Sequence, residues 1–191
     1  MTRAHHLSAA LAGLGLALAG CAASGSAQPP IGFISFCLRH AEACQPVPDA
    51  QRPAAAAPAV MTVARWQELH QVNAHINTAI SPLHDTDNTG RMEWWTYPDT
   101  GRGDCEDYAL EKRRALLARG WPAHALLITV GETLSGEPHA VLTVVTDHGD
   151  LVLDNLSMTI VEAGRAPYRW HKRQSRHDPL HWVRLDREGR P

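Results

Sequence analysis

The chain has no marked excess of charge of either sign. Among its 191 residues, 18 are lysine or arginine and 20 are aspartate or glutamate, so the formal net charge is −2. Proteins that bind nucleic acid usually carry a basic stripe or patch, and none stands out here. The sequence also shows no internal repeat. Its composition is that of an ordinary soluble globular protein, and its length fits one domain once the ends are discounted.

A long hydrophobic run is also missing. The most apolar stretch, Leu7 to Ala19, is shorter than the about 20 residues that a transmembrane helix needs. One arginine and two histidines precede it, which is the order of a secretory signal. We therefore expect residues 1–27 to be a signal peptide that exports the chain to the periplasm.

Two processing sites fit this signal. Leu18-Ala19-Gly20-Cys21 is similar to a lipoprotein signal box, in which cleavage before Cys21 is accompanied by lipidation of that cysteine. The alternative is cleavage after Gly25-Ser26-Ala27, which would leave a free soluble protein. The first site predicts a membrane contact through a lipid anchor alone.

Cysteines are few, namely Cys21, Cys37, Cys44 and Cys105. Cys37 and Cys44 are close enough in sequence to join in a short loop, and in an oxidising periplasm such a pair is usually a disulfide. The alternative is a pair of buried free thiols. Because Cys21 is assigned to the signal, Cys105 is left over. A lone free thiol in an exported chain needs either burial or a function.

Composition divides the mature chain into two parts. Residues 28–60 form an N-terminal segment that holds the Cys37/Cys44 pair, and its stretch from 46 to 60 is rich in proline and alanine. Such a stretch is typical of a linker or an irregular surface segment. The main domain is expected over residues 61–191.

The main domain is predicted to be α+β. Thr62 can cap a helix whose apolar stripe ends before Ser81-Pro82, and Asp104 can cap a second helix that stops at Gly120. The stripe consists of Trp66, Leu69, Val72, Ile76 and Ile80. Three strand-like runs follow, at 125–130, 139–146 and 151–156. Helices followed by antiparallel strands are an α+β pattern.

Cys105 falls in the first turn of the second predicted helix. Unpaired backbone N–H groups at a helix start favour a thiolate and should lower the pKa of this thiol. Asp104, Glu106 and Asp107 act in the opposite direction, because like charges raise the pKa of a thiol. A cationic partner is therefore needed, and an imidazolium is the usual one.

His139 and Asp154 are the best candidates to complete a catalytic triad with Cys105. A cysteine at a helix start, a histidine on a strand and a carboxylate on the next strand provide nucleophile, base and orienting group. The alternative is a structural histidine and a solvated turn aspartate. A hairpin turn at His148-Gly149 would pair Asp154 with Thr143 and leave it about 13 Å from His139, at ~3.3 Å per residue. Contact then requires a longer loop, a bulge or another register.

The segment around Cys105 resembles the catalytic motif of a known family. Gly101-Arg102-Gly103-Asp104-Cys105-Glu106-Asp107-Tyr108-Ala109, followed by Lys112 and Gly120-Trp121, is similar to the motif of the bacterial transglutaminase-like cysteine proteases. His139-Ala140-Val141-Leu142 and Val152-Leu153-Asp154-Asn155 resemble the histidine and aspartate motifs of that family. Val72-Asn73, Ile76-Asn77 and the patch from Trp95 to Pro98 are similar to its upstream segment. The resemblance covers roughly residues 31 to 185.

The resemblance implies a papain/transglutaminase-like fold and a cysteine endopeptidase that works through a thioester on Cys105. In LapG-like members the substrate is a large surface adhesin, so that cleavage affects biofilm formation, and the regulator is an inner-membrane receptor. These members also bind calcium beside the cysteine. Carried over, that implies Ca²⁺ at Asp104 and Glu106, with Asp107 as a further ligand, and carboxylates suit this ion. The alternative role of the same residues is helix capping.

Two other functions share these residues. A transglutaminase or amidase would resolve the same thioester with an amine instead of water. A non-catalytic lipoprotein would keep the fold as a binding module.

Overall fold

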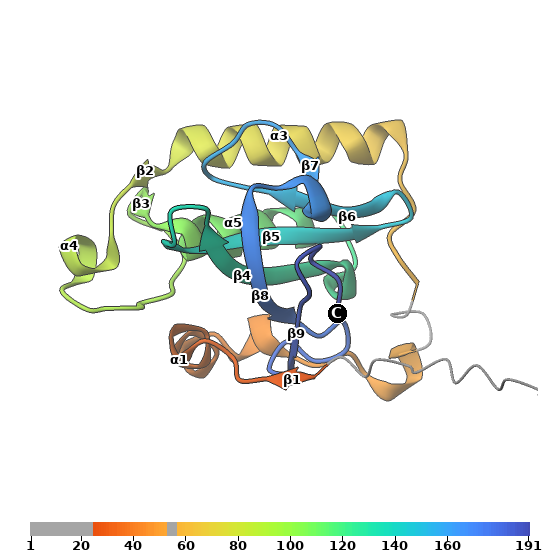
Figure 1. Ribbon diagram of the computed structural model, residues 1–191, viewed down its shortest axis with the longest axis horizontal. Coiled ribbons are helices and arrows are strands. Elements are labelled where there is room, and N and C mark those ends of the chain that lie inside the picture. Colours follow the sequence, from red (N-terminus) through yellow and green to blue (C-terminus); the bar gives the residue numbers. More distant parts are fainter. Residues whose placement is uncertain (1–24, 53–56) are drawn as a thin grey trace, which may run out of the picture.

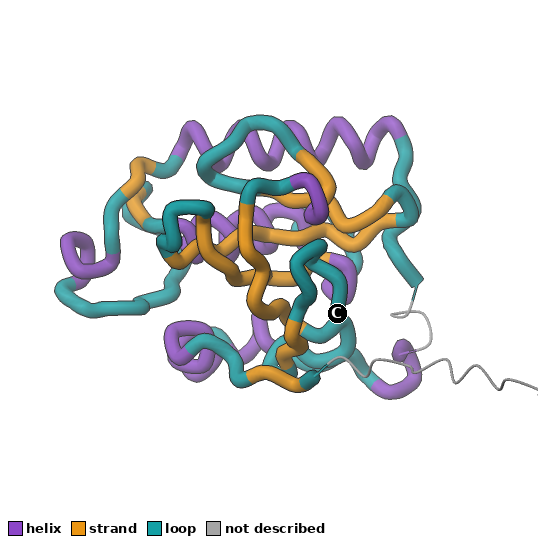
Figure 2. The backbone as a smooth tube through the Cα atoms, viewed as in Figure 1, coloured by secondary structure: helices purple, strands orange, loops and turns teal. Residues whose placement is uncertain are grey.

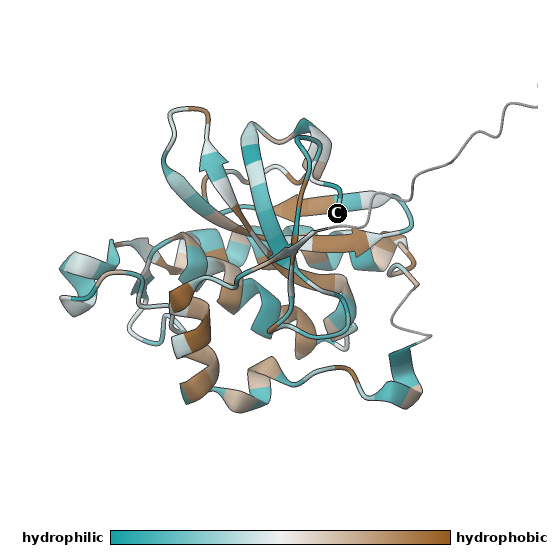
Figure 3. Cartoon of the chain, turned by 60° about the horizontal axis from the view of Figure 1, so that its bottom comes forward, coloured by the Kyte–Doolittle hydropathy of each residue, from teal (hydrophilic) through white to brown (hydrophobic). Residues whose placement is uncertain are grey.

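A seven-stranded antiparallel sheet organises the fold (Figure 1). The computed structural model describes residues 25–52 and 57–191. The strand order is β1-β9-β8-β4-β5-β6-β7. The strands are β1 Ser26–Ala27, β4 Leu126–Thr133, β5 Pro138–Thr146, β6 Gly149–Leu153, β7 Val161–Glu162, β8 Tyr168–Gln174 and β9 Trp182–Arg184. β4 and β5 lie in the middle, and β5 is buried along nearly its whole length. Hydrophobic residues gather in the middle of the sheet (Figure 3).

Helices lie on several sides of the sheet (Figure 2). The α-helices are α1 Ile31–Arg39, α3 Val63–Ala79, α4 Asp85–Thr89 and α5 Cys105–Leu117. Short 3-10 turns lie at Ala41–Cys44, Asp49–Gln51, Ala123–Ala125 and Ala163–Arg165. α5 packs on β5 and α3 packs on α5. The predicted α+β class is confirmed. No helix in residues 25–52 and 57–191 is long and apolar enough to cross a membrane.

Both predicted helices begin where expected. The Thr62 side chain caps α3 by accepting a hydrogen bond from the Arg65 N–H at 3.1 Å. Four of the five predicted stripe residues are buried, but Trp66 is 41% exposed and stacks edge-on against His70 instead. α5 ends at Leu117, and Gly120 then adopts a φ of 81°, which glycine tolerates best.

The N-terminal segment shares a core with the rest of the described chain. Phe33 of α1 packs edge-to-face on Trp95 and on Trp182, with ring centroids 5.7 and 5.6 Å apart. β1 pairs with β9 at the edge of the sheet. At the end of the proline- and alanine-rich stretch, the Ala59 N–H donates to the Val145 carbonyl. The boundary at residue 60 remains a prediction from composition.

The structure contains the expected disulfide between Cys37 and Cys44, which ties α1 to the 3-10 turn that follows it. Replacing both cysteines with serine should lower the free energy of unfolding by about 2–3 kcal/mol, because the short loop is no longer closed in the unfolded chain. For a chain of this size the melting temperature should fall by roughly 5–10 °C. Calorimetry of the variant, with the reduced wild type alongside, measures this. Equal melting temperatures for variant and oxidised wild type would contradict it.

Candidate active site

Cys105 is the first residue of α5 and lies on the wall of a cavity of about 960 Å³. His139 and Ala140, at the start of β5, line the same cavity. Cys105 is the free cysteine of the described part of the chain. Sequence-distant elements therefore meet here, since α5 packs directly on β5.

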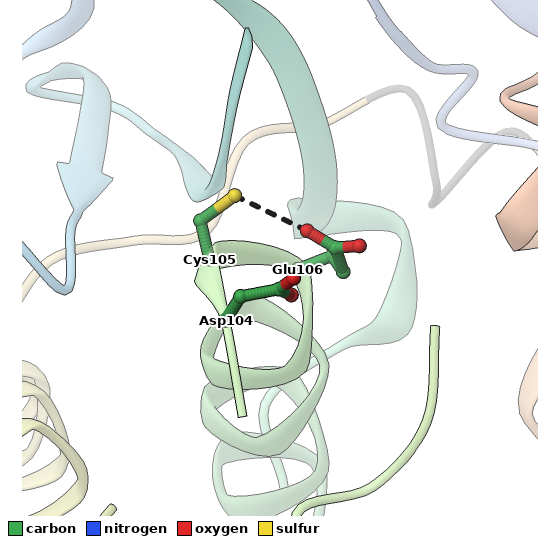
Figure 4. Close-up of side chains that lie close together, drawn as sticks. All are labelled: Asp104, Cys105 and Glu106. Atoms are coloured by element: carbon green, nitrogen blue, oxygen red, sulfur yellow. Dashed lines mark hydrogen bonds between the residues drawn. The ribbon is translucent and has the colours of Figure 1, made fainter. Parts of the chain in front are cut away.

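The thiol of Cys105 lies beside acidic side chains. Its thiol donates a hydrogen bond to Glu106 Oε2 at 3.2 Å (Figure 4). Burial and the nearby Glu106 carboxylate raise the pKa of Cys105 well above its usual value, and a backbone N–H bond from Ala140 only partly offsets them. Burial, and then the neighbouring carboxylates, outweigh the backbone N–H groups of the helix start, so the pKa of the thiol is raised and not lowered as the helix start alone predicts.

Asp104 occupies the N-cap position of α5, but its side chain makes no capping hydrogen bond. Its Oδ2 accepts instead from the Asp85 N–H at 3.3 Å, and its Oδ1 is buried without a partner. The predicted side-chain cap is therefore wrong. The carboxylate lies instead beside those of Asp85, Glu106 and Asp107.

Three aspartates form a group. Oxygens of Asp85, Asp104 and Asp107 lie within 4.8 Å of one another. Asp85 Oδ1, Asp104 Oδ1 and Asp107 Oδ2 are buried and have no hydrogen-bond partner. The outer oxygens are held by backbone: Asp85 Oδ2 accepts from the Trp94 N–H, and Asp107 Oδ1 accepts from the Thr96 N–H at 2.8 Å. Three neighbouring carboxylates, each with a buried oxygen that has no hydrogen-bond partner, are the kind of donor set that a hard cation prefers.

Burial and mutual repulsion raise the pKa values of these acidic side chains. Burial, and then the charge of Asp104, raise the pKa of Glu106 to about 9. Burial, with the charges of Asp104 and Asp85, raises the pKa of Asp107 to about 8. The pKa of Asp85 is also raised, chiefly by burial. Glu106, Asp104 and Cys105 offer ligand atoms within 4.8 Å of one another, so the acidic residues extend from the three aspartates to the thiol.

Asp85 is absent from the residues that the sequence indicated. It reaches the group because β2 (Ser81–Pro82) and β3 (Arg102–Gly103) pair in parallel, so the residues that follow Pro82 lie beside those that follow Gly103. Gly103 is required there, since a Cβ at this position would lie 2.5 Å from Asp107 Oδ2. No pattern in the sequence predicted the pairing of β2 with β3.

His139 and Asp154 are in direct contact. His139 Nε2 lies 2.9 Å from Asp154 Oδ1, and the two residues are only 7% and 5% exposed. The hairpin turns at Asp147 and His148, so that Thr146 pairs with Gly149 and Leu142 with Leu153. The register differs by two residues from the one that a His148-Gly149 turn would give. Asp154 follows the end of β6 and bends to the histidine, which removes the expected gap of about 13 Å at ~3.3 Å per residue.

The carboxylate of Asp154 is held at both oxygens. Oδ1 also accepts from the Leu156 N–H at 3.0 Å, and Oδ2 accepts from the Tyr168 hydroxyl. Burial alone would raise the pKa of Asp154, but hydrogen bonds from His139, Tyr168 and Leu156 outweigh it and hold the pKa below its usual value. The group is therefore an ionised acceptor at neutral pH. Tyr168 was not among the residues that the sequence indicated.

The arrangement can support acyl chemistry. Because Nε2 of His139 is bonded to Asp154, Nδ1 is the ring nitrogen left for a proton from the cavity. The start of α5 provides backbone N–H groups beside Cys105 for a developing oxyanion.

Comparison with known proteins gives a consistent picture. A family model described as bacterial transglutaminase-like cysteine proteinase matches residues 23–190. Solved structures of Legionella pneumophila LapG are similar. The calcium-bound form is 28% identical with a TM-score of 0.50, over 56% of this chain and 62% of that one. A second LapG structure is 29% identical with a TM-score of 0.51, over 61% and 67%. The EGTA-treated form is 29% identical with a TM-score of 0.52, over 61% and 65%. The match thus spans about two thirds of each LapG chain. A comparison with curated protein sequences gave no match.

Proposed function

Because the chain belongs to the bacterial transglutaminase-like cysteine proteinases, we propose that it is a cysteine endopeptidase with Cys105 as nucleophile, His139 as base and Asp154 as orienting carboxylate. The observation that carries the proposal is the 2.9 Å contact between His139 and Asp154, at the cavity wall that also holds Cys105. Family, cavity and hydrogen bonding thus support the same three residues.

The reaction follows from this arrangement. His139 Nδ1 takes the proton of Cys105 as the sulfur bonds to the substrate carbonyl carbon, and the same nitrogen then gives that proton to the leaving amine. The peptide C–N bond breaks and a thioester remains on Cys105. Water, deprotonated by His139, attacks the thioester and releases the acid and the free thiol. Asp154 holds the imidazole in one orientation throughout.

Asp85, Asp104 and Asp107 together fit a calcium ion, and we assign it to them with Glu106 beside them. Their three unpaired oxygens supply the hard ligands that Ca²⁺ prefers. A LapG structure that resembles this chain is calcium-bound. When bound, the ion supplies positive charge that offsets the acidic effect on the Cys105 thiol.

Hydrolysis and acyl transfer give different products from the same thioester. Incubating the protein with casein and a fluorescent primary amine should yield shorter fragments, with little amine incorporated, because the proposed reaction ends with water. Predominant labelling of full-length casein would instead make the protein a transferase. A folded protein whose Cys105 fails to react with iodoacetamide at neutral pH would point to a binding module. Mass spectrometry of the alkylated peptide identifies the site.

The cellular role is part of the proposal. Cys21 and the processing site before it lie outside the described residues, and nothing in the structure tests the alternative site after Ala27, so export to the periplasm and lipid anchoring rest on the sequence alone. A large surface adhesin as substrate and an inner-membrane receptor as regulator rest on the family resemblance. Proteomic comparison of material released from cells with the wild-type chain and with Cys105→Ala tests the substrate. Identical released proteins would reject the adhesin.

A further inference from the structure

Tyr168 lies against the His139–Asp154 pair from the far side of β4. Its hydroxyl donates to Asp154 Oδ2, and its ring packs on the His139 ring with centroids 5.0 Å apart and planes tilted by 32°. One side chain therefore contacts both members of the pair, although Tyr168 and His139 come from different strands, β8 and β5.

The strand pairing of the sheet determines the position of Tyr168. In the ladder, Gly131 of β4 is paired with His139 on one side and with Trp170 on the other. A bulge between Val130 and Gly131 shifts the β8 register by one residue, so that Thr133 pairs with Tyr168. Because side chains alternate along a strand, this shift puts Tyr168 on the same face as His139. Without the bulge it would face the other side.

Glycine at position 131 is what allows the contact to cross β4. Gly131 has no side chain between His139 and the aromatic residues of β8, and a Cβ there would lie 2.5 Å from the Arg169 carbonyl oxygen. The Tyr168 ring is supported in turn by Trp170, with centroids 5.2 Å apart. The contact is thus built from a bulge, a glycine and an aromatic pair.

We propose that Tyr168 is a positioning residue for the reaction, which fixes the Asp154 carboxylate and shields the His139–Asp154 hydrogen bond from water. The inference rests on the proposed function. If Oδ2 has no donor, the carboxylate can rotate about its last bond and the 2.9 Å contact of Oδ1 with His139 loosens. The ring excludes water from the same hydrogen bond, which strengthens it. Tyr168 does not line the cavity, so it has no expected contact with substrate.

Two variants separate these contributions. Tyr168→Phe keeps the ring and removes the hydroxyl, and Tyr168→Leu removes both. With casein as substrate, kcat should fall roughly tenfold for phenylalanine and about 100-fold for leucine, since a hydrogen bond to a charged group is lost and then the shield as well. KM should stay within twofold. The matched control is Tyr97→Phe, which also removes one phenol hydroxyl, but from a ring that packs on Phe36 and His40.

A spectroscopic measurement keeps this test independent of catalysis. In the wild type, the His139 Nε2–H proton bonded to Asp154 should give a downfield NMR signal, and in Tyr168→Phe that signal should broaden or move upfield. A shifted signal with no casein cleavage by the wild type would support the positioning role and reject the peptidase. An unchanged signal and an unchanged kcat in Tyr168→Phe would overturn the positioning role while leaving the peptidase intact. A changed KM with unchanged kcat would also overturn it.

Discussion

Cys105→Ala will reduce peptide-bond hydrolysis by at least about 10⁴-fold, because no other group in the cavity can form the thioester. The cavity keeps its backbone donors and its His139–Asp154 pair, so substrate binding should change little. Initial rates of casein cleavage at several substrate concentrations measure the loss in kcat. The variant should melt at or above the wild-type temperature, since it removes a half-buried thiol that is held against a carboxylate.

Glu111→Gln is a useful control for that experiment. Glu111 lies on the same helix and pairs with Arg114 at 2.6 Å, outside the residues that line the cavity. It should leave the rate within about twofold of wild type, as expected for a surface ion pair. Equal loss in both variants would mean that α5 is simply damaged. Substantial cleavage by Cys105→Ala would remove Cys105 from the mechanism.

The Asp85→Asn variant should melt below the wild type in calcium and above it in EGTA. In calcium at about 100 times its dissociation constant, the wild type should gain about 2.7 kcal/mol, or roughly 5–10 °C in melting temperature. The variant should gain much less, because one carboxylate ligand is lost. In EGTA the variant should melt above the wild type, since the asparagine carbonyl can still accept from the Trp94 N–H while the repulsion with Asp104 disappears.

This reversal in the order of the two melting temperatures is what identifies the site. A general loss of stability would lower the variant in both solutions. Asp87→Asn is the matched control, because Asp87 is an exposed aspartate on the same short helix α4. It should follow the wild type in calcium and in EGTA. If Asp85→Asn also follows the wild type in both, calcium is not bound by these aspartates.

The sequence predicted those parts of the fold that depend on local signals. Thr62 and Gly120 mark helix ends through capping and backbone conformation, and both act as expected. The apolar stripe predicted for α3 includes one residue too many, because Trp66 lies near the start of the helix and packs on His70 rather than in the core. Helix periodicity shows which face of a helix is apolar, but not how far along the helix that face is covered by the rest of the protein.

The candidate site was harder to predict, since it depends on pairing between distant segments. Contact between Asp154 and His139 depends on the β5–β6 register, which differs by two residues from the one that the sequence suggested. Asp85 required the two-residue β2–β3 pairing, and Tyr168 required the bulge beside Gly131. Asp104 matched the N-cap pattern, yet its carboxylate joined the acidic group. In each case tertiary contact decided what the local pattern left open.

The β1–β9 pairing would make the edge of the sheet depend on which of the two expected cleavage sites is used. Ser26 pairs with Val183 and Ala27 with Trp182, and the Arg184 N–H donates to the Gly25 carbonyl at 2.9 Å. A chain that starts at Cys21 keeps this strand, whereas one processed after Ala27 loses it. The second form would present the bare backbone of β9 as an open edge, to which another copy can add by strand pairing. The position of one protease cut would thereby set the tendency of the mature protein to self-associate.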